Sequence, residues 1–190
     1  MEWLFKHLKG RGLKGVKLFI GDKFLGLIES LGECFPEARY QRCMVHFFRN
    51  VFTYVPKGKI KVVVAMLKAI HGQEDREEAL KKSRSVVSKL KEMKLRKSAE
   101  VVERGVEETL SYTQFPREHW RRIRTNNPLE RILREVRRRT RVVGNFPDVN
   151  SALMLMAARL RHVEGTKWES VRYLKLERLE NPELEEVAAV

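Results

Sequence analysis

Cysteine is scarce in this sequence, and long apolar runs are missing from it. The only cysteines among the 190 residues are Cys34 and Cys43, which excludes a disulfide framework, and their spacing matches no zinc motif. No apolar run approaches the roughly 20 residues that a membrane-spanning helix needs, and the N-terminus has no signal-peptide pattern. We therefore expect reduced thiols, no membrane segment and a cytoplasmic protein.

Negative charge is also in short supply. The chain has 39 Lys and Arg residues against 25 Asp and Glu residues, a net charge of +14. An excess of this size favours a polyanionic partner, and nucleic acid is the first candidate. Hydrophobic residues make up 43% of the chain, which is enough for a folded core, so we expect one domain or one domain with an insertion.

The order of the expected elements indicates an α/β protein with a helical middle. The hydrophobic pattern predicts strands at residues 16–20 and 38–44 and helices at residues 2–9, 24–32, 59–71, 74–92, 95–112 and 149–163. A strand, helix, strand order implies a parallel unit, and the three charged helices after it form a helical insertion. The first helical pattern begins at Trp3 with no capping residue before it, which indicates a start inside a longer protein.

Lysine is absent from the most basic part of the chain, residues 116–145. Ten arginines and three glutamates lie there, so this segment carries +7, half of the net charge of the chain. The planar guanidinium suits phosphate, so we expect a DNA-binding surface. Its expected members are Arg121, Arg122, Arg124, Arg131, Arg134, Arg137, Arg138, Arg139 and Arg141.

Two carboxylates are candidates for chemistry, and each has a structural alternative. Asp22 follows a buried strand, where α/β proteins gather catalytic groups, but it can also cap the helix expected at residues 24–32. Glu130 shares a helical stripe with Arg134, Arg137 and Arg141, which suits a metal-binding carboxylate beside phosphate-binding arginines. The alternative for Glu130 is a capping box that begins at Asn127.

The pair Cys43 and His46 offers a soft ligand set, but no second histidine or cysteine pair has metal-site spacing. A structural zinc site is one interpretation, and packing with hydrogen bonding at the end of the second strand is the favoured one. Trp120 also has two possible roles, stacking on a nucleic-acid base or packing in the hydrophobic core, and we favour packing in the core.

Several stretches resemble the bacterial Mutator-like insertion-sequence transposases, in order and at family spacing from about residue 3 to residue 179. They are Leu13 to Asp22, Tyr40 to Phe47, Phe115 to Trp120, Arg124 to Arg131 and Arg137 to Gly144. The resemblance implies a partial RNase H-like α/β fold with an all-helical insertion, and a DDE set of carboxylates that binds Mg²⁺ or Mn²⁺. Its implied parts are residues 1–56 and 115–165 as the core, 57–114 as the insertion and 166–190 as a C-terminal tail.

The resemblance also assigns roles to individual residues. Asp22 matches the second acidic residue of the family and Glu130 the final one. The supporting residues that it implies are Cys43, His46, Asn127 and Arg137. The first Asp of the family has no counterpart here, so we expect little or no transposase activity from this chain alone.

The sequence differs from the family pattern directly after Asp22. Many relatives have Asp-Ala-His-x-Gly there, whereas Lys23, Phe24 and Leu25 separate Asp22 from Gly26, so no histidine stands beside it in sequence.

The expected partner is DNA, both the ends of an insertion element and its target, bound by a homo-oligomer associated with the nucleoid of a bacterium or archaeon. Two alternatives belong to other classes of protein. One is a non-catalytic DNA-binding remnant or regulator of transposition, and the other is a basic RNA-associated structural protein. The absence of paired aromatics on strands argues against the second.

Overall fold

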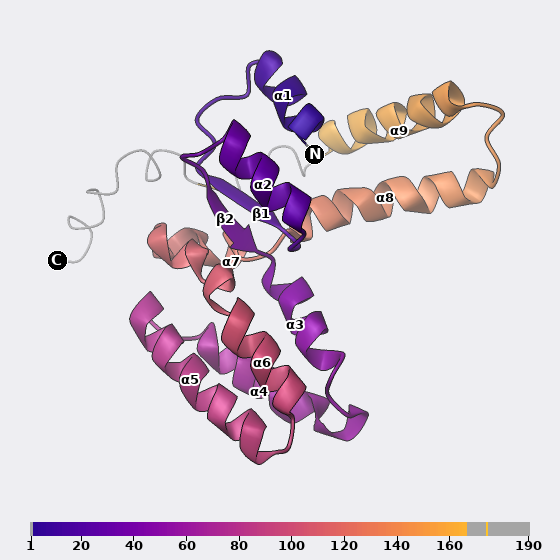
Figure 1. Cartoon of the computed structure of the whole chain (residues 1–190). Coiled ribbons are helices and arrows are strands. Elements are labelled where there is room, and N and C mark those ends of the chain that lie inside the picture. The colour runs from indigo at the N-terminus through magenta and orange to yellow at the C-terminus, as the bar shows by residue number, and fades with distance from the viewer. Residues whose placement is uncertain (1, 167–173, 175–190) are drawn as a thin grey trace. The chain divides into compact units, whose positions relative to one another are not determined.

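The computed structural model describes residues 2–166 and Leu174, and the chain divides into two compact units (Figure 1). Unit 1 covers residues 1–125 and unit 2 covers residues 126–190, and each is described by itself. Most of the predicted C-terminal tail, residues 166–190, lies outside the described residues. In the described part of the chain, no helix is long and apolar enough to cross a membrane.

Unit 1 is mostly helical and contains one small sheet. Its helices and strands are α1 (Glu2–Gly10), β1 (Leu18–Gly21), α2 (Leu25–Cys34), β2 (Arg39–Arg42), α3 (Met44–Phe52), α4 (Ile60–Ile70), α5 (Arg76–Glu92), α6 (Arg96–Gly105) and α7 (Trp120–Ile123). Short 3₁₀ turns occur at Lys57–Lys59, Glu107–Thr109, Ser111–Gln114 and Arg117–His119.

The two strands pair in parallel, as the strand, helix, strand order predicts, and the α/β class is confirmed at this level. Leu18 pairs with Arg39 at one end of the ladder and Gly21 with Arg42 at the other. The second strand is shorter than predicted because the chain turns into α3 at Met44. The sequence pattern did not separate this helix from the strand before it.

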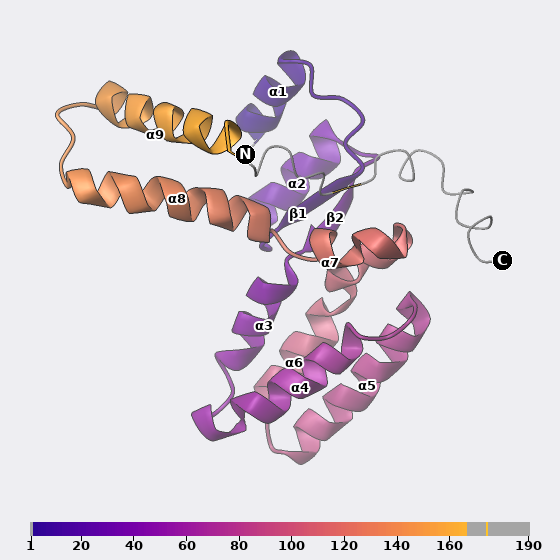
Figure 2. The same cartoon turned by 180° about the vertical axis from the view of Figure 1, so that it is seen from behind.

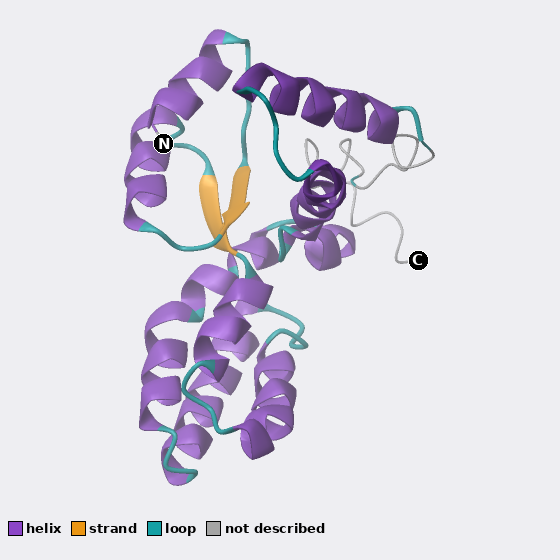
Figure 3. Cartoon of the chain, turned by 90° about the vertical axis from the view of Figure 1, so that its right-hand side faces the viewer, coloured by secondary structure: helices purple, strands orange, loops and turns teal. Residues whose placement is uncertain are grey.

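An aromatic cluster joins α1 and α2 to the sheet. Phe19 on β1 lies 5.1 Å from Phe5 of α1 and 5.4 Å from Phe35 after α2, measured between ring centroids. Leu27, Leu31 and Cys34 of α2 belong to the same cluster. Figure 2 shows the same two helices from behind, and Figure 3 shows both on one side of the two strands.

Residues 57–114 contain only helices, 3₁₀ turns and loops. The helices α3, α4, α5 and α6 pack on one another around a core whose fully buried members include Val63, Leu67, Ile70, Leu90 and Val102. The third helix predicted there ends at Gly105 instead of residue 112, and two 3₁₀ turns follow it.

A buried glutamine explains why the chain leaves the helix after Gly105. The Gln41 side chain on β2 donates to the Thr109 carbonyl at 2.8 Å and accepts from the Tyr112 amide at 2.8 Å. Ser111 Oγ also donates to the Tyr40 carbonyl at 2.7 Å. Because a buried amide needs partners, these bonds fix the 107–112 segment against the outer edge of β2.

His71 lies in the same buried network. Its Nδ1 is 3.4 Å from the Tyr112 hydroxyl, and its Nε2 is 3.5 Å from Thr109 Oγ1. Burial, with a smaller effect from the Arg124 charge, lowers the pKa of His71 to about 3. The imidazole is therefore neutral and serves as a structural hydrogen-bonding group.

Unit 2 is described as a helical hairpin of α8 (Asn127–Val143) and α9 (Val149–Glu164), visible in Figure 1. Gly144, which ends α8, has a positive φ of 76° that suits glycine. The predicted cap of α9 is confirmed, since Asp148 Oδ1 accepts from the Ser151 amide at 2.8 Å. Between the helices, Arg159 Nη2 binds Glu135 Oε2 at 2.7 Å.

Candidate functional site

Asp22 directly follows the carboxyl end of β1. Its neighbour Gly21 is in register with Arg42, and the Cys43 amide donates to the Gly21 carbonyl at 2.7 Å. Asp22 and Cys43 therefore lie beyond the same edge of the sheet, the edge where ligands bind in parallel α/β proteins. The Asp22 side chain is 52% exposed, so its carboxylate is open to a ligand.

The alternative role of Asp22 as a helix cap is wrong. The helix α2 begins at Leu25, its N-cap is Phe24, and no side chain makes a capping hydrogen bond there. Asp22 Oδ1 instead accepts from the adjacent Lys23 amide at 2.8 Å. Its position is therefore determined by the strand edge and by the turn into α2.

His46 approaches Asp22 from the first turn of α3. The His46 Nδ1 atom lies 3.9 Å from Asp22 Oδ2, and the His46 side chain is 20% exposed. Cys43, the N-cap of α3, is fully buried. The Cys-x-x-His stretch thus directs its thiol to the core and its imidazole to the carboxylate. Among the described residues, no three His, Cys, Asp or Glu side chains are grouped as a metal site would require.

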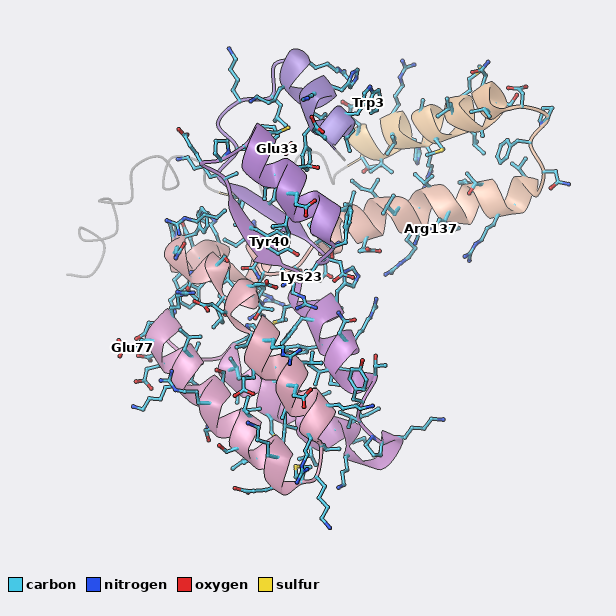
Figure 4. All side chains as sticks on the ribbon, in the orientation of Figure 1. Trp3, Lys23, Glu33, Tyr40, Glu77 and Arg137 are labelled. Carbon is cyan, nitrogen blue, oxygen red and sulfur yellow. The ribbon has the colours of Figure 1, made fainter. Side chains whose placement is uncertain are left out.

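Glu108 is a further carboxylate at this edge, and the sequence pattern did not single it out. It forms an ion pair with Lys23, and its Oε2 lies 3.6 Å from Arg42 Nη1. Figure 4 labels Lys23, which lies in the loop after β1, and Tyr40, which lies on β2. Burial and, after it, the Glu108 charge raise the pKa of Tyr40, and Asp22 adds to that increase. Glu108 is 85 residues from Lys23 in sequence, so local patterns carry no signal for the pair.

Glu130, in unit 2, is half-buried on the first turns of α8. The capping box predicted from Asn127 to Glu130 is wrong, because α8 begins at Asn127 and its N-cap is Asn126. Asn126 has a φ of −90° and a ψ of 24°, not the extended backbone of a capping residue, and it makes no side-chain capping bond. The Glu130 amide bonds to the Asn126 carbonyl at 3.1 Å, which is ordinary helix bonding.

The predicted arginine surface is divided between the two units. In unit 1, Arg121 and Arg122 are exposed on α7, and Arg124 is half-buried. In unit 2, the exposed arginines of α8 are Arg131, Arg134, Arg137, Arg138, Arg139 and Arg141. Arg137 is labelled in Figure 4, where it projects from α8.

Arg138 has an internal partner on its own helix. It binds Glu135 Oε2 at 3.2 Å, and hydrogen bonds from Arg159 and then Arg138 lower the pKa of Glu135. At about 100° per residue, Arg134, Arg137 and Arg141 share one side of α8 with Glu130, next to the side that contains buried Val136.

Trp120 packs at the edge of the helical part of unit 1, in agreement with the favoured interpretation. Its Nε1 donates to the Phe115 carbonyl at 2.6 Å, and its ring lies 5.4 Å from the Tyr112 ring in an edge-on arrangement.

The side-chain atoms at the Asp22 edge suit a hard divalent cation in part. Carboxylate oxygens are the ligands that Mg²⁺ and Mn²⁺ prefer, and Asp22 presents one that is exposed and held by its neighbours. At the same edge, the His46 imidazole lies near Asp22, and the Glu108 carboxylate is paired with Lys23 and Arg42.

Comparison with known proteins gives one family. The family model described as "Transposase, Mutator family" matches residues 2–170. The chain is 40% identical over 177 residues to the transposase for insertion sequence element IS1081 of Mycobacterium tuberculosis, covering 92% of this chain and 42% of that protein.

Two other relatives give the same result. The chain is 36% identical over 173 residues to the transposase for ISRM5 of Rhizobium meliloti, which covers 91% of this chain and 43% of that protein. It is 35% identical over 157 residues to the transposase for IS256 in transposon Tn4001 of Staphylococcus aureus, which covers 82% of this chain and 40% of that protein. The chain thus spans less than half the length of each of these relatives.

Proposed function

The chain belongs to the Mutator family of transposases, and from this premise we propose that it forms part of a catalytic domain that cuts and joins DNA with divalent metal ions. Asp22 and Glu130 are the metal-binding carboxylates in this proposal. The observation that carries it is the position of Asp22, exposed at the carboxyl end of β1, beside His46 and without a capping role.

An RNase H-like fold is part of the same proposal. Three observations support it: the parallel pair of strands, the acidic residue at the end of the first strand, and the helical segment between that strand and Glu130. The family implies the same order of elements.

Different residues of the chain have different roles in the proposed chemistry. Asp22 and Glu130 would hold Mg²⁺ or Mn²⁺, with His46 orienting the Asp22 carboxylate. When bound by these carboxylates, such ions would supply Lewis-acid chemistry for displacement at a DNA phosphorus, with water or a DNA 3′-hydroxyl as the nucleophile. The exposed arginines of α8 bind the DNA backbone, which gives affinity with little sequence information.

DNA at the ends of an insertion element and at its target are the proposed substrates. A homo-oligomer on DNA and association with the nucleoid belong to the proposal as well. The oligomer follows from the need to hold two DNA ends and a target together during strand transfer, and association with the nucleoid follows from DNA binding.

The experiment that tests the proposal is nicking of element-end DNA in the presence of Mg²⁺ or Mn²⁺. It compares the chain alone with a chimera in which the N-terminal part of the IS1081 transposase precedes residue 1, since the relatives are more than twice as long. We expect metal-dependent nicking by the chimera and little by the chain alone. Glu130→Gln should abolish nicking, whereas Glu164→Gln, an exposed carboxylate at the end of α9, should not.

The alternatives have distinct outcomes in the same experiment. Salt-sensitive DNA binding without nicking in any form would support a DNA-binding regulator of transposition. A preference for RNA over DNA of equal length would support an RNA-associated protein.

A further inference from the structure

A three-residue ion cluster lies beside Asp22 and has no part in the proposed chemistry. Glu108 forms an ion pair with Lys23 through Oε1, and its buried Oε2 lies 3.6 Å from Nη1 of Arg42. Lys23 follows Asp22 in sequence, and Arg42 is in register with Gly21 before Asp22. Glu108 therefore binds one cation just after the end of β1 and another at the end of β2.

Arg42 has little freedom to move within this cluster. Its side chain is 10% exposed, and its guanidinium lies 5.1 Å from the centre of the Phe47 ring. A Cβ atom on Gly105 would be 2.6 Å from Arg42 Nη1 and 3.1 Å from the Phe47 ring. Gly105 thus leaves the space that Arg42 occupies, and the buried cation requires a nearby anion, which Glu108 provides.

The Glu108 backbone is held in place by the network around Gln41. Glu108 is the middle residue of the 3₁₀ turn Glu107–Thr109, and the Thr109 carbonyl accepts from Gln41 Nε2 at 2.8 Å. The helical segment thus delivers one carboxylate to a defined place at the strand edge.

We propose that Glu108 is a positioning residue for Asp22: it binds the Lys23 ammonium and so keeps Asp22 available to a divalent metal ion. This inference rests on the proposed function. A lysine directly after a carboxylate can pair with it, and the resulting ion pair competes with metal binding. Because Glu108 binds the Lys23 ammonium, this ammonium does not pair with Asp22. The Lys23 backbone amide still donates to Asp22 Oδ1.

The proposal predicts a specific pattern of Mn²⁺ binding to the full chain. Binding is measured by paramagnetic broadening of the amide NMR signals of residues 21–24 during Mn²⁺ titration, so no cleavage is needed. Glu108→Gln should weaken Mn²⁺ binding about tenfold. Adding Lys23→Gln to Glu108→Gln should restore it, because the competing ammonium is then gone. A purely structural loss would not be repaired by removing a second charge.

The control variants separate this inference from the proposed function. Glu107→Gln removes the adjacent carboxylate, which pairs with Arg76, and should leave Mn²⁺ binding unchanged. If Asp22→Asn abolishes binding while Glu108→Gln does not alter it, or if Lys23→Gln fails to restore it, the positioning role is refuted and the metal site stands. If Asp22→Asn leaves binding unchanged, the proposed function fails, and the role of Glu108 fails with it.

Discussion

The Oδ2 atom of Asp22 lies 3.9 Å from Nδ1 of His46, so the residue after β1 meets the first turn of α3 at one edge of the sheet. The two side chains are 24 residues apart in sequence, and the parallel pairing of β1 with β2 brings them together. The contact links a carboxylate suited to metal with an imidazole that can orient it.

His46→Ala should reduce metal-dependent nicking by the chimera about tenfold or more, because groups that orient metal ligands typically contribute factors of about 10 to 100. Thermal unfolding should change little, since the His46 side chain is not part of the fully buried core. The matched control is His162→Ala, an exposed histidine near the end of α9. Equal nicking rates for the two variants would show that His46 is not part of the site.

The arginine side of α8 should set the salt dependence of DNA binding. Each phosphate contact contributes roughly −0.9 to the slope of log K against log salt. The double variant Arg134→Ala with Arg137→Ala should therefore make this slope shallower by about 1.8. Lys82→Ala with Arg84→Ala removes the same charge from the exposed side of α5 and should leave the slope nearly unchanged. Fluorescence anisotropy from low to moderate salt measures both, and equal slopes for the two variants would place the DNA surface elsewhere.

His71 should make the fold sensitive to acid. Its pKa is lowered to about 3 in the folded protein by burial, from an ordinary value of 6.5. Below pH 6.5 the unfolded chain binds a proton that the folded chain excludes, so stability falls as the pH falls toward 3. Between pH 8 and pH 5 this loss amounts to about 2 kcal/mol in the free energy of unfolding.

Urea denaturation at the two pH values tests this with His71→Gln, which should remove that part of the loss. His162→Gln, at an exposed histidine, should keep the wild-type dependence. An unchanged dependence in His71→Gln would show that the imidazole is not held neutral.

Gln41 should contribute far more to the free energy of unfolding than an exposed glutamine does. Gln41→Ala leaves the Thr109 carbonyl and the Tyr112 amide without their buried partner, which should cost about 3 kcal/mol in the free energy of unfolding. Gln114→Ala, at an exposed residue that bonds to Arg39, should cost about 0.5 kcal/mol or less. Chemical denaturation of both variants checks this, and similar losses would contradict the role of Gln41 as an anchor.

Much of the secondary structure followed from the sequence, because it depends on local pattern. The periodicity located α1, α2, α4, α5 and α9 to within a few residues, and Asp148 capped α9 as its residue type predicts. The parallel pairing of the strands followed from the strand, helix, strand order.

The failures share a physical cause: they depend on backbone angles or on distant partners. Asp22 and Asn127 have the residue types of helix caps, but α2 and α8 begin at other residues, with Phe24 and Asn126 as their N-caps. The third helix of residues 57–114 ends early because Gln41, more than 60 residues away, binds the segment after it. The partnership of Lys23 with Glu108 spans 85 residues and leaves no periodic trace.

The most direct test of the central claim is replacement of the Asp22 oxygen ligands by sulfur. Mg²⁺ prefers oxygen strongly, whereas Mn²⁺ accepts softer ligands. In the chimera, Asp22→Cys should abolish nicking in Mg²⁺ and recover a substantial part of it in Mn²⁺, and Asp22→Ala should be inactive in both. Recovery confined to Asp22→Cys with Mn²⁺ would identify Asp22 as a metal ligand. Equal loss in both metals, or nicking by Asp22→Ala, would contradict the account.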